Sequence, residues 1–409
     1  MMMSEATNLI PIGNFWILPF RTACRPRQTR WTMSTRAATD PLTAYARLWG
    51  LHQCLTCGLF KMLASAVGGQ GDGLILSNVK LTLQVLPPPV QAAYVVSVLW
   101  LLVAPRVSPR LLLVLHIIHM YLHITRLPEI WNSEWWDGLV EVTVLLAGVT
   151  CLLLRRPVSK DELAHWMSMR AAPAARMVFL LLYALTVLYK LTTTFLDPKV
   201  SCAPLFLMAL LESVWPSSVA DPPATLLRLI VSISPAATVF VEALIPWALY
   251  VSPWPFGYAV GVLFHLLIAL TPPPNNAGGF SAGVLTRYFF LAPRQCARAF
   301  DVRPAPAFTA ACAATMAFSI VLGSRRNGDW GCVVSMALSL FHLHAILASP
   351  PNQSTEKEAT REDEADPPRV TRALSLIAAT SAGLTLAYGL GPVLGLQDST
   401  RSLGSMRTP

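Results

Sequence analysis

The sequence predicts an all-α protein, a polytopic integral membrane bundle of about eight to eleven transmembrane helices. Three observations support this prediction: 54% of the 409 residues are hydrophobic, only 13% are charged, and the mean hydropathy is +0.51. Soluble domains carry about 25% charged residues. This chain therefore has too little charged surface for a water-soluble globule, a disordered protein or a nucleic-acid-binding protein. Its expected partner is the lipid bilayer.

Apolar segments follow one another from about residue 45, separated by loops rich in Pro, Gly and charge. A spanning helix needs about 20 mostly apolar residues, and several of these segments are shorter. We expect helices at 48–67, 89–104, 111–126, 138–154, 177–196, 226–250, 256–271, 279–293, 306–323, 331–348 and 373–394. The short run Leu205–Leu211 is more typical of a re-entrant or interfacial helix.

Composition divides the chain into four parts. Residues 1–44 are rich in Arg, Ser and Thr and poor in acids, which is typical of an organelle transit peptide or of a basic cytosolic tail. A plastid or endomembrane location would fit the first alternative. Residues 45–349 form the expected multi-pass membrane domain. Residues 350–372 have the acidic, Pro-flanked composition of a disordered linker, and residues 373–409 form a final hydrophobic helix with a C-terminal tail.

Loop charges predict a topology for the bundle. The net charge of +9 arises largely in basic loops, at 106–110, 155–176 and 294–303. If the helices alternate in direction, these loops share one side with the basic N-terminus, and the acidic loop 127–137 lies on the other. The positive-inside rule then places the N-terminus in the cytoplasm or in the equivalent compartment of an organelle. Arg325 and Arg326 break this pattern, which indicates that one of the later spans is miscounted.

Three histidines, His116, His119 and His123, lie within one apolar segment. At about 100° per residue they share one stripe of a helix. Such a stripe is able to bind a transition metal, to relay protons or simply to form packing hydrogen bonds. We expect no metal, because membrane metal enzymes use several His-rich motifs, and we retain these three as secondary candidates. Glu141 in the next segment is expected to face the bundle and to pair with one of them.

Two further motifs have structural interpretations. The paired Trp135 and Trp136, beside acidic residues, are typical of an aromatic anchor at the membrane interface. Cys54 and Cys57 form a CxxC motif preceded by His52, but no second pair follows at a spacing suited to a metal. We therefore expect buried free thiols at these two positions.

Charged residues inside apolar segments are costly, so each one is a functional candidate. Lys190 ends the apolar stretch 177–189, where it either snorkels to the interface or acts as a base, because burial favours the neutral amine. Glu242 lies within an apolar segment and needs a partner. The candidates from neighbouring segments are Arg228, Arg287 and His265.

A set of short motifs then suggests a family. The motifs are Tyr189-Lys190-Leu191, Phe195-Leu196-Asp197-Pro198, Ser201-Cys202-Ala203, Glu242 with Pro246, Gly261-Val262-Leu263-Phe264-His265 and Arg287-Tyr288-Phe289-Phe290. In order and spacing they resemble the horizontally transferred transmembrane domain family, whose membrane domain is shared with vitamin K-dependent gamma-carboxylase. The resemblance covers roughly residues 45–295, and the chain has Thr186 and Thr192–Thr194 where the family usually has Gly and Asn.

This resemblance implies a chemistry. In the carboxylase branch a lysine deprotonates a reduced quinone, which reacts with oxygen to give an epoxide. The strong base so generated removes a proton from a substrate glutamate, which is then carboxylated by carbon dioxide. By the resemblance Lys190 is the catalytic base, Glu242 and His265 are site residues, and a reduced quinone or lipid-like molecule is the ligand.

Two other functions stay open. In a transporter or channel, the three histidines of the stripe would line a proton or solute path with Glu141 and Glu242. The sequence has no evident inverted repeat of the kind that many secondary transporters show. In a non-catalytic membrane scaffold, all of these polar groups would only satisfy one another.

Overall fold

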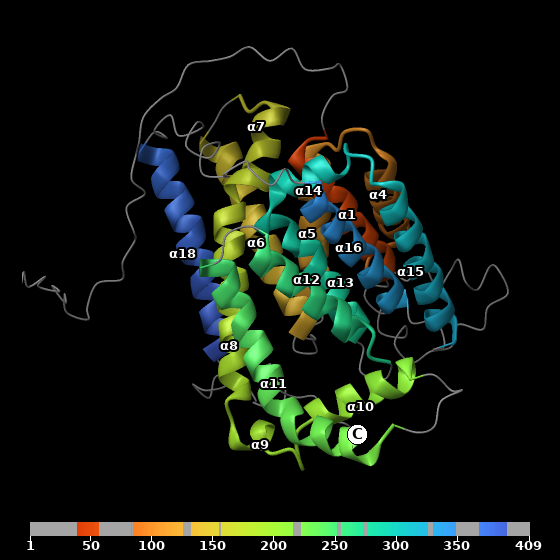
Figure 1. Cartoon of the computed structure of the whole chain (residues 1–409). Coiled ribbons are helices and arrows are strands. Elements are labelled where there is room, and N and C mark those ends of the chain that lie inside the picture. Colours follow the sequence, from red (N-terminus) through yellow and green to blue (C-terminus); the bar gives the residue numbers. More distant parts are fainter. Residues whose placement is uncertain are drawn as a thin grey trace, which may run out of the picture. The chain divides into compact units, whose positions relative to one another are not determined.

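The computed structural model describes residues 39–56, 83, 85–125, 132–154, 157–215, 222–251, 255–272, 277–325, 330–348 and 368–390. All of these residues belong to one compact unit, made of residues 37–350 and 367–409. Residues 1–38 of the predicted N-terminal segment and residues 350–367 of the predicted acidic linker lie outside the described residues, whereas Pro41–Ala44 form the start of the first helix, which begins inside the predicted tail. The described part of the chain is helical and contains no β-strand (Figure 1).

The helices are joined mostly by short connections. In chain order they are α1 (Pro41–Thr56), α4 (Pro88–Val103), α5 (Pro109–Thr125), α6 (Asn132–Leu154), α7 (Lys160–His165), the π-helical turn η2 (Trp166–Arg170), α8 (Ala172–Lys190), α9 (Thr193–Leu196), α10 (Ala203–Val214), α11 (Ala224–Val251), α12 (Phe256–Ala269), α13 (Ala277–Arg287), the 3₁₀ turn η3 (Tyr288–Leu291), α14 (Pro293–Ala299), α15 (Pro306–Arg325), α16 (Trp330–Leu347) and α18 (Pro368–Leu390).

Five helical stretches among the described residues are long and apolar enough to cross a membrane. They are Trp136–Leu154, Lys160–Lys190, Ala224–Val251, Trp330–Leu347 and Pro368–Leu390. Shorter apolar helices, including α4, α5 and α12, accompany them. The prediction of an all-α bundle with membrane-compatible helices is thus confirmed, whereas the number of spans stays a prediction.

Helix ends differ from the predicted ones where local capping intervenes. The segment expected at 177–196 ends at Lys190, because Thr192 accepts a hydrogen bond from the backbone N–H of Phe195 at 3.2 Å and starts the short helix α9. The final helix begins at Pro368 instead of residue 373, so the last residues assigned to the linker are helical. Proline is well suited to this first position, where its missing N–H is not needed.

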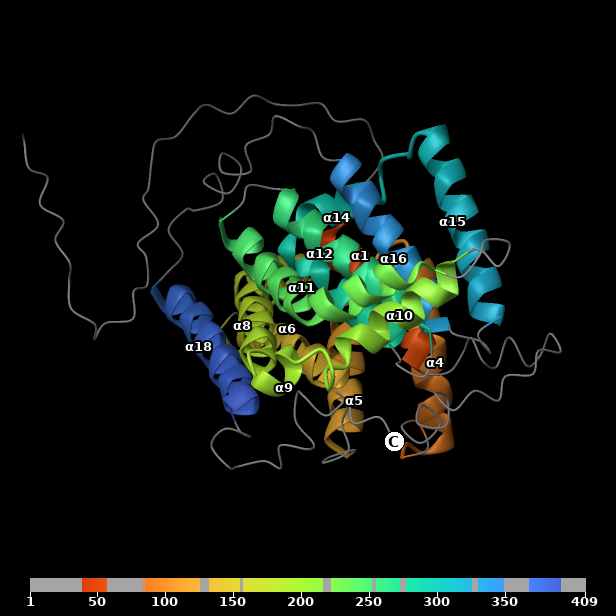
Figure 2. The same cartoon turned by 60° about the horizontal axis from the view of Figure 1, so that its bottom comes forward.

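Helix α10 contains the run that was expected not to span. It has only 12 residues, and it packs against α11. Figures 1 and 2 show it lying across the direction of α8 and α18, beside the first turns of α11. Its orientation agrees with the expectation of a re-entrant or interfacial helix.

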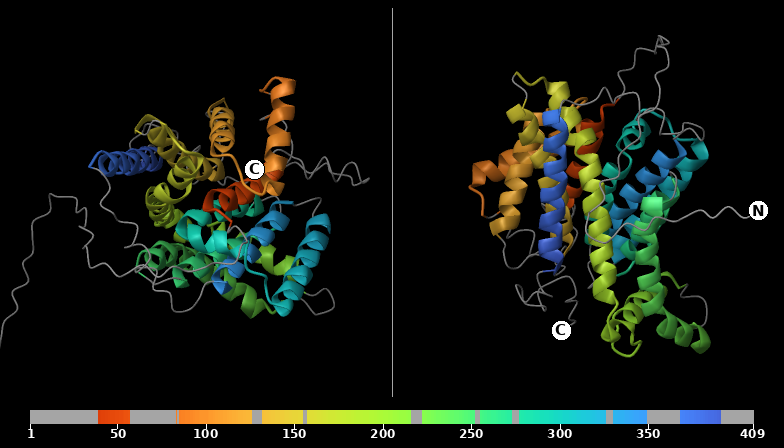
Figure 3. Two further views of the ribbon diagram at one scale, coloured as in Figure 1. Left: turned by 90° about the horizontal axis from the view of Figure 1, so that it is seen from above. Right: turned by 90° about the vertical axis from the view of Figure 1, so that its left-hand side faces the viewer.

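Helix α1 occupies the centre of the described bundle. It packs against α4, α13, α14 and α16, and Figure 3 shows it among these helices in the view from above. Its aromatic residues Tyr45 and Trp49 are fully buried, as are Phe289 and Phe290 of η3, which lie against Tyr45. Cys54 is a buried free thiol, as predicted, and Cys57 lies outside the described residues.

Large apolar side chains cover outer faces of several helices. Phe240, Tyr250 and Leu267 are each more than half exposed, and so are Ile117 and Leu376 on other helices. An apolar exterior, with polar groups gathered in buried clusters, is the distribution expected for a protein in lipid.

The basic loops that were predicted to share one side do meet at one end of the bundle. Arg106 forms ion pairs with Asp161 just after the start of α7 and, at 3.8 Å, with Asp40 just before α1. At the same end the backbone of Thr39 binds Asp301, which follows α14. Figure 1 shows α7 and α9 at opposite ends of α8. The segment that follows α9, which contains Lys199, therefore lies at the end of the bundle away from these basic loops.

Glycines allow α13 and α16 to pack with their backbones in close approach. A Cβ atom added to Gly331 would lie 2.6 Å from the backbone nitrogen of Gly279, and one added to Gly278 would lie 2.5 Å from that of Cys332. Real Cβ atoms do not approach backbone so closely. Small residues at such crossings are a general feature of helix packing in membranes.

We predict that Gly331→Ala destabilises the protein by about 1–3 kcal/mol, because the added methyl group forces α13 and α16 apart. The matched control is Gly383→Ala in α18, where a Cβ meets nothing within 4 Å. That change should be neutral or slightly stabilising, since alanine is the better helix former by about 1 kcal/mol. Thermal unfolding of both variants in the same detergent tests this, and equal midpoints would contradict the close packing.

Candidate functional site

Arg287, at the end of α13, is the centre of a buried charged network. Its side chain is only 1% exposed. One guanidinium nitrogen, Nη2, donates to Glu141. The other, Nη1, lies 3.2 Å from an oxygen of Asp137 and donates to Nδ1 of His52 at 2.9 Å. Since Nδ1 of His52 accepts this bond, its proton is on Nε2, which faces Asp137 at 3.7 Å.

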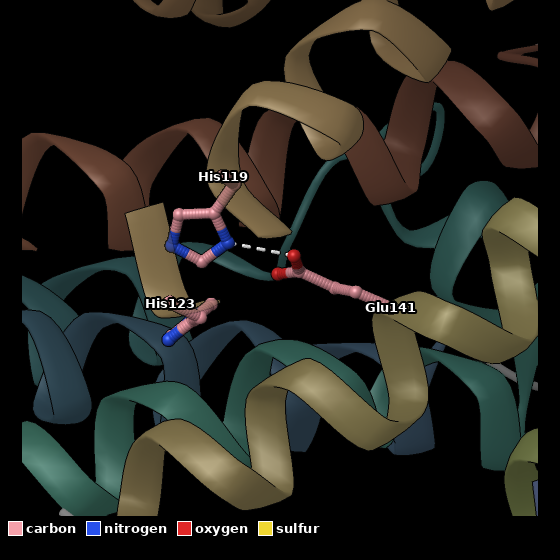
Figure 4. A group of neighbouring side chains, drawn as sticks. All are labelled: His119, His123 and Glu141. Carbon is pink, nitrogen blue, oxygen red and sulfur yellow. Dashed lines mark hydrogen bonds and ion pairs between the residues drawn. The ribbon is translucent and has the colours of Figure 1, made fainter. Parts of the chain in front are cut away.

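The two carboxylate oxygens of Glu141 have different partners. Oε1 accepts hydrogen bonds from Arg287 and, at 2.7 Å, from the indole nitrogen of Trp49. Oε2 lies 2.6 Å from Nδ1 of His119 (Figure 4). The predicted pairing of Glu141 with a histidine is therefore confirmed. Helices α1, α5, α6 and α13 meet at this one carboxylate.

The histidine stripe divides into two parts in the structure. The rings of His119 and His123 lie 4.3 Å apart, and both residues are buried near Glu141. His116 instead lies beside the phenol of Tyr45, with Nε2 3.0 Å from the hydroxyl oxygen. One ligand atom from each of His119, His123 and Glu141 fits within 4.8 Å of the others, whereas His116 is not part of this group.

The charges in this network are unequal. Within the part of the chain that the structure describes, two buried carboxylates, Asp137 and Glu141, face the guanidinium of Arg287. A low-dielectric interior strongly disfavours an unbalanced charge. Next to Glu141 lie the rings of His119 and His123, whose nitrogens are able to bind a cation.

A second polar group surrounds His265 on α12. The hydroxyl of Tyr183 lies 2.6 Å from Nε2 of His265 and 2.7 Å from the hydroxyl of Tyr288. Gly261 makes room for this arrangement, since a Cβ there would lie 2.0 Å from the Tyr288 hydroxyl oxygen. Gly261 and His265, both from the motif Gly261-Val262-Leu263-Phe264-His265, therefore contribute to the same cluster of hydroxyl groups.

Lys190 and Glu242 form an ion pair where α8 passes α11. The lysine side chain is 26% exposed and the glutamate side chain 9%. The ring of Phe195 lies 5.6 Å from the ammonium nitrogen. Tyr183 and Lys190 are two turns apart on α8, a distance of about 10 Å along the helix axis. His265, which lies beside Tyr183, is therefore on the same side of the bundle as the ion pair without contacting it.

The structure corrects two predictions. The partner of Glu242 is Lys190, and none of Arg228, Arg287 and His265 takes this role. Trp136 is not an interfacial anchor. It is 3% exposed and packs edge-on against Tyr183, because the first turns of α6 must enter the bundle for Asp137 to reach Arg287.

Sequence reasoning also missed residues of the network. Trp49 and Asp137 are not among the candidates that the sequence offers, and Arg287 enters there as a possible partner for Glu242 and as the first residue of a family motif. A signal was present: Asp137 and Glu141 are four residues apart, so they lie on one face of a helix. Two acids on one face of an apolar helix require a cation from a facing helix.

Comparison with known proteins returns no match: no family model fits the chain, and no curated protein and no solved structure is significantly similar to it. The resemblance to the horizontally transferred transmembrane domain family therefore stays a prediction that rests on the motifs.

We predict that Arg287→Met destabilises the protein by about 3–5 kcal/mol, because two buried carboxylates lose their cation. The measurement is the thermal midpoint and the monodisperse fraction in detergent. Adding Glu141→Gln to this variant should restore part of the loss by removing one of the charges. Arg228→Met is the control, since Arg228 is exposed on α11. Equal stability of the two arginine variants would contradict the network.

Proposed function

We propose that the chain is a multi-pass integral membrane protein with an acid–base site at Lys190 and Glu242 that acts on a lipid-soluble molecule. The observation that carries this proposal is the ion pair itself, a lysine and a carboxylate held together within an apolar helical bundle. Such pairs are rare in apolar segments and mark functional sites more often than surface charges do.

The surroundings of the pair suit a ligand that arrives from lipid. Leu188 and Leu191, on either side of Lys190, are both more than half exposed, and Phe240 near Glu242 is 67% exposed. The lysine side chain is itself 26% exposed, so an apolar molecule in the lipid would reach the amine without crossing the bundle. A reduced quinone, which has a polar hydroxyl head and an apolar body, has the required chemistry.

The pair is able to work as a base through its shared proton. A general base at this pair requires that Glu242 take the proton that the two groups share, so that the amine of Lys190 is free. Oε2 of Glu242 is buried and has no hydrogen-bond partner among the described residues. Glu242 can thus hold the proton while the Lys190 amine accepts one from the substrate.

The reaction class follows from the family resemblance. Lys190 would deprotonate a reduced quinone, whose anion reacts with oxygen to give an epoxide. The base formed in that step would remove a proton from a carbon acid for carboxylation by carbon dioxide. Glu242 would position the amine. His265 lies beside the hydroxyl of Tyr183, which is two turns before Lys190 on α8, and it would stabilise the packing of α8 against α12 next to the ion pair.

We predict that membranes containing the protein convert a reduced naphthoquinone and oxygen to the epoxide. Lys190→Met should lower this rate by about 100-fold or more, the usual contribution of a general base. Lys199→Met is the matched control, because Lys199 is exposed and its side chain lies outside the ion pair. Chromatographic measurement of the epoxide, with the folded fraction of each variant, gives the comparison.

Two outcomes would count against this reaction: equal rates for Lys190→Met and wild type, or no epoxide from folded protein. The second outcome would mean that the chain resembles the carboxylase-related family in fold and not in reaction. The network that joins His119, Glu141 and Arg287 across three helices would then favour the alternative of a proton or solute path. A scaffold would show neither epoxide formation nor flux.

We also predict a topology. Lys199→Cys and Val302→Cys place thiols at exposed positions at opposite ends of the bundle. A membrane-impermeant maleimide should label only one of them in sealed vesicles and only the other in inverted vesicles, with Val302→Cys on the cytoplasmic side. The unsubstituted chain measures labelling of the native cysteines. Labelling of both positions from the same side would exclude the proposed spanning arrangement.

A further inference from the structure

The group His119, His123 and Glu141 is separate from the Lys190 pair and has no role in the proposed reaction. The two histidines are four residues apart on α5, so their rings leave the same face of the helix. Glu141 faces them from α6 (Figure 4). All three residues are buried, which separates them from the exposed acidic clusters that are common on protein surfaces.

From this geometry we infer that His119, His123 and Glu141 bind one divalent first-row transition metal ion. One ligand atom from each residue lies within 4.8 Å of the other two. Ligand atoms around a single such ion are about 3–4 Å apart, so small side-chain rotations bring all three into place. The hydrogen bond between His119 and Glu141 is then replaced by two bonds to the metal.

The residues around Glu141 orient it for this role. Trp49 and Arg287 both donate to Oε1, which leaves Oε2 directed at the two imidazoles. Hydrogen bonds that fix a ligating carboxylate in this way are typical of protein metal sites. Helix bundles commonly build such sites from side chains on facing helices.

Charge favours a cation at this point. Among the described residues, the anionic oxygens of Asp137 and Glu141 lie beside Arg287, and Oε2 of Glu141 points away from that guanidinium, so a cation at this point faces a carboxylate oxygen. Two imidazoles and one carboxylate select zinc, iron or cobalt over magnesium and calcium, which prefer oxygen ligands. Three protein ligands leave a coordination position open, as in catalytic metal sites.

Cobalt(II) is the probe for the test, because its visible spectrum reports its coordination. The full chain, carrying no oligohistidine tag, is placed in lipid nanodiscs, stripped with a chelator and titrated with cobalt(II). We expect about one ion per chain with the absorption of a low-coordinate site. Elemental analysis of protein purified without chelator gives a second measure of bound metal.

The decisive variant is His123→Ala, which should abolish binding. His123→Gln serves the same purpose if the alanine variant does not fold. His344→Ala is the matched control, since the ring of His344 on α16 bonds to backbone carbonyls and should leave cobalt binding unchanged. Trp49→Phe should keep the stoichiometry and weaken the affinity by about 10–100-fold, because it removes a donor that orients Glu141.

Absence of binding to the wild-type protein would overturn the inference and leave the group as a hydrogen-bonded histidine–carboxylate cluster. Equal binding by His123→Ala and by wild type would place the ion elsewhere and would also overturn it. Neither outcome bears on epoxide formation at Lys190, so the two proposals fail independently.

Discussion

The need to neutralise charge inside an apolar bundle is the constraint on which the described structure depends. Arg287 lies at the junction of α1, α6 and α13 and is almost fully buried, with Asp137 and Glu141 as its partners. Removing a guanidinium from water costs far more than a single hydrogen bond returns. The helices that carry these partners must therefore stay in register, and α5 joins them through His119.

This constraint explains where the polar and apolar residues lie. Tyr45, Trp49 and His52 are spaced along α1 so that aromatic and hydrogen-bonding groups meet the network at the centre. The outer helices α11, α12 and α18 present large apolar side chains outward. Since lipid provides no hydrogen bonds, such a protein has to satisfy its polar groups internally. Buried polar clusters and an apolar exterior are both what a lipid solvent would produce, in agreement with the proposed membrane location.

The two candidate sites differ in access. The Lys190–Glu242 pair lies near the edge of the bundle, next to exposed apolar side chains, and suits a ligand that diffuses in the membrane. The group around Glu141 is enclosed by four helices and suits an ion or a proton held in a defined geometry. Tyr183, His265 and Tyr288 lie between α8, α12 and η3 and form a third polar group on the side of the bundle that carries the lysine.

The sequence by itself determined the helical class, nearly all of the apolar helices and the pairing of Glu141 with a histidine. Hydropathy and helical periodicity depend on composition and spacing along the chain, which a sequence states directly. Only the tertiary structure decided that Glu242 pairs with Lys190, that Trp136 is buried, and that Trp49, Asp137 and Arg287 meet around Glu141. These contacts join residues from helices far apart in the chain, and several partners were plausible for each charge. The choice among them depends on which helix faces pack together, and spacing along one helix does not contain that information.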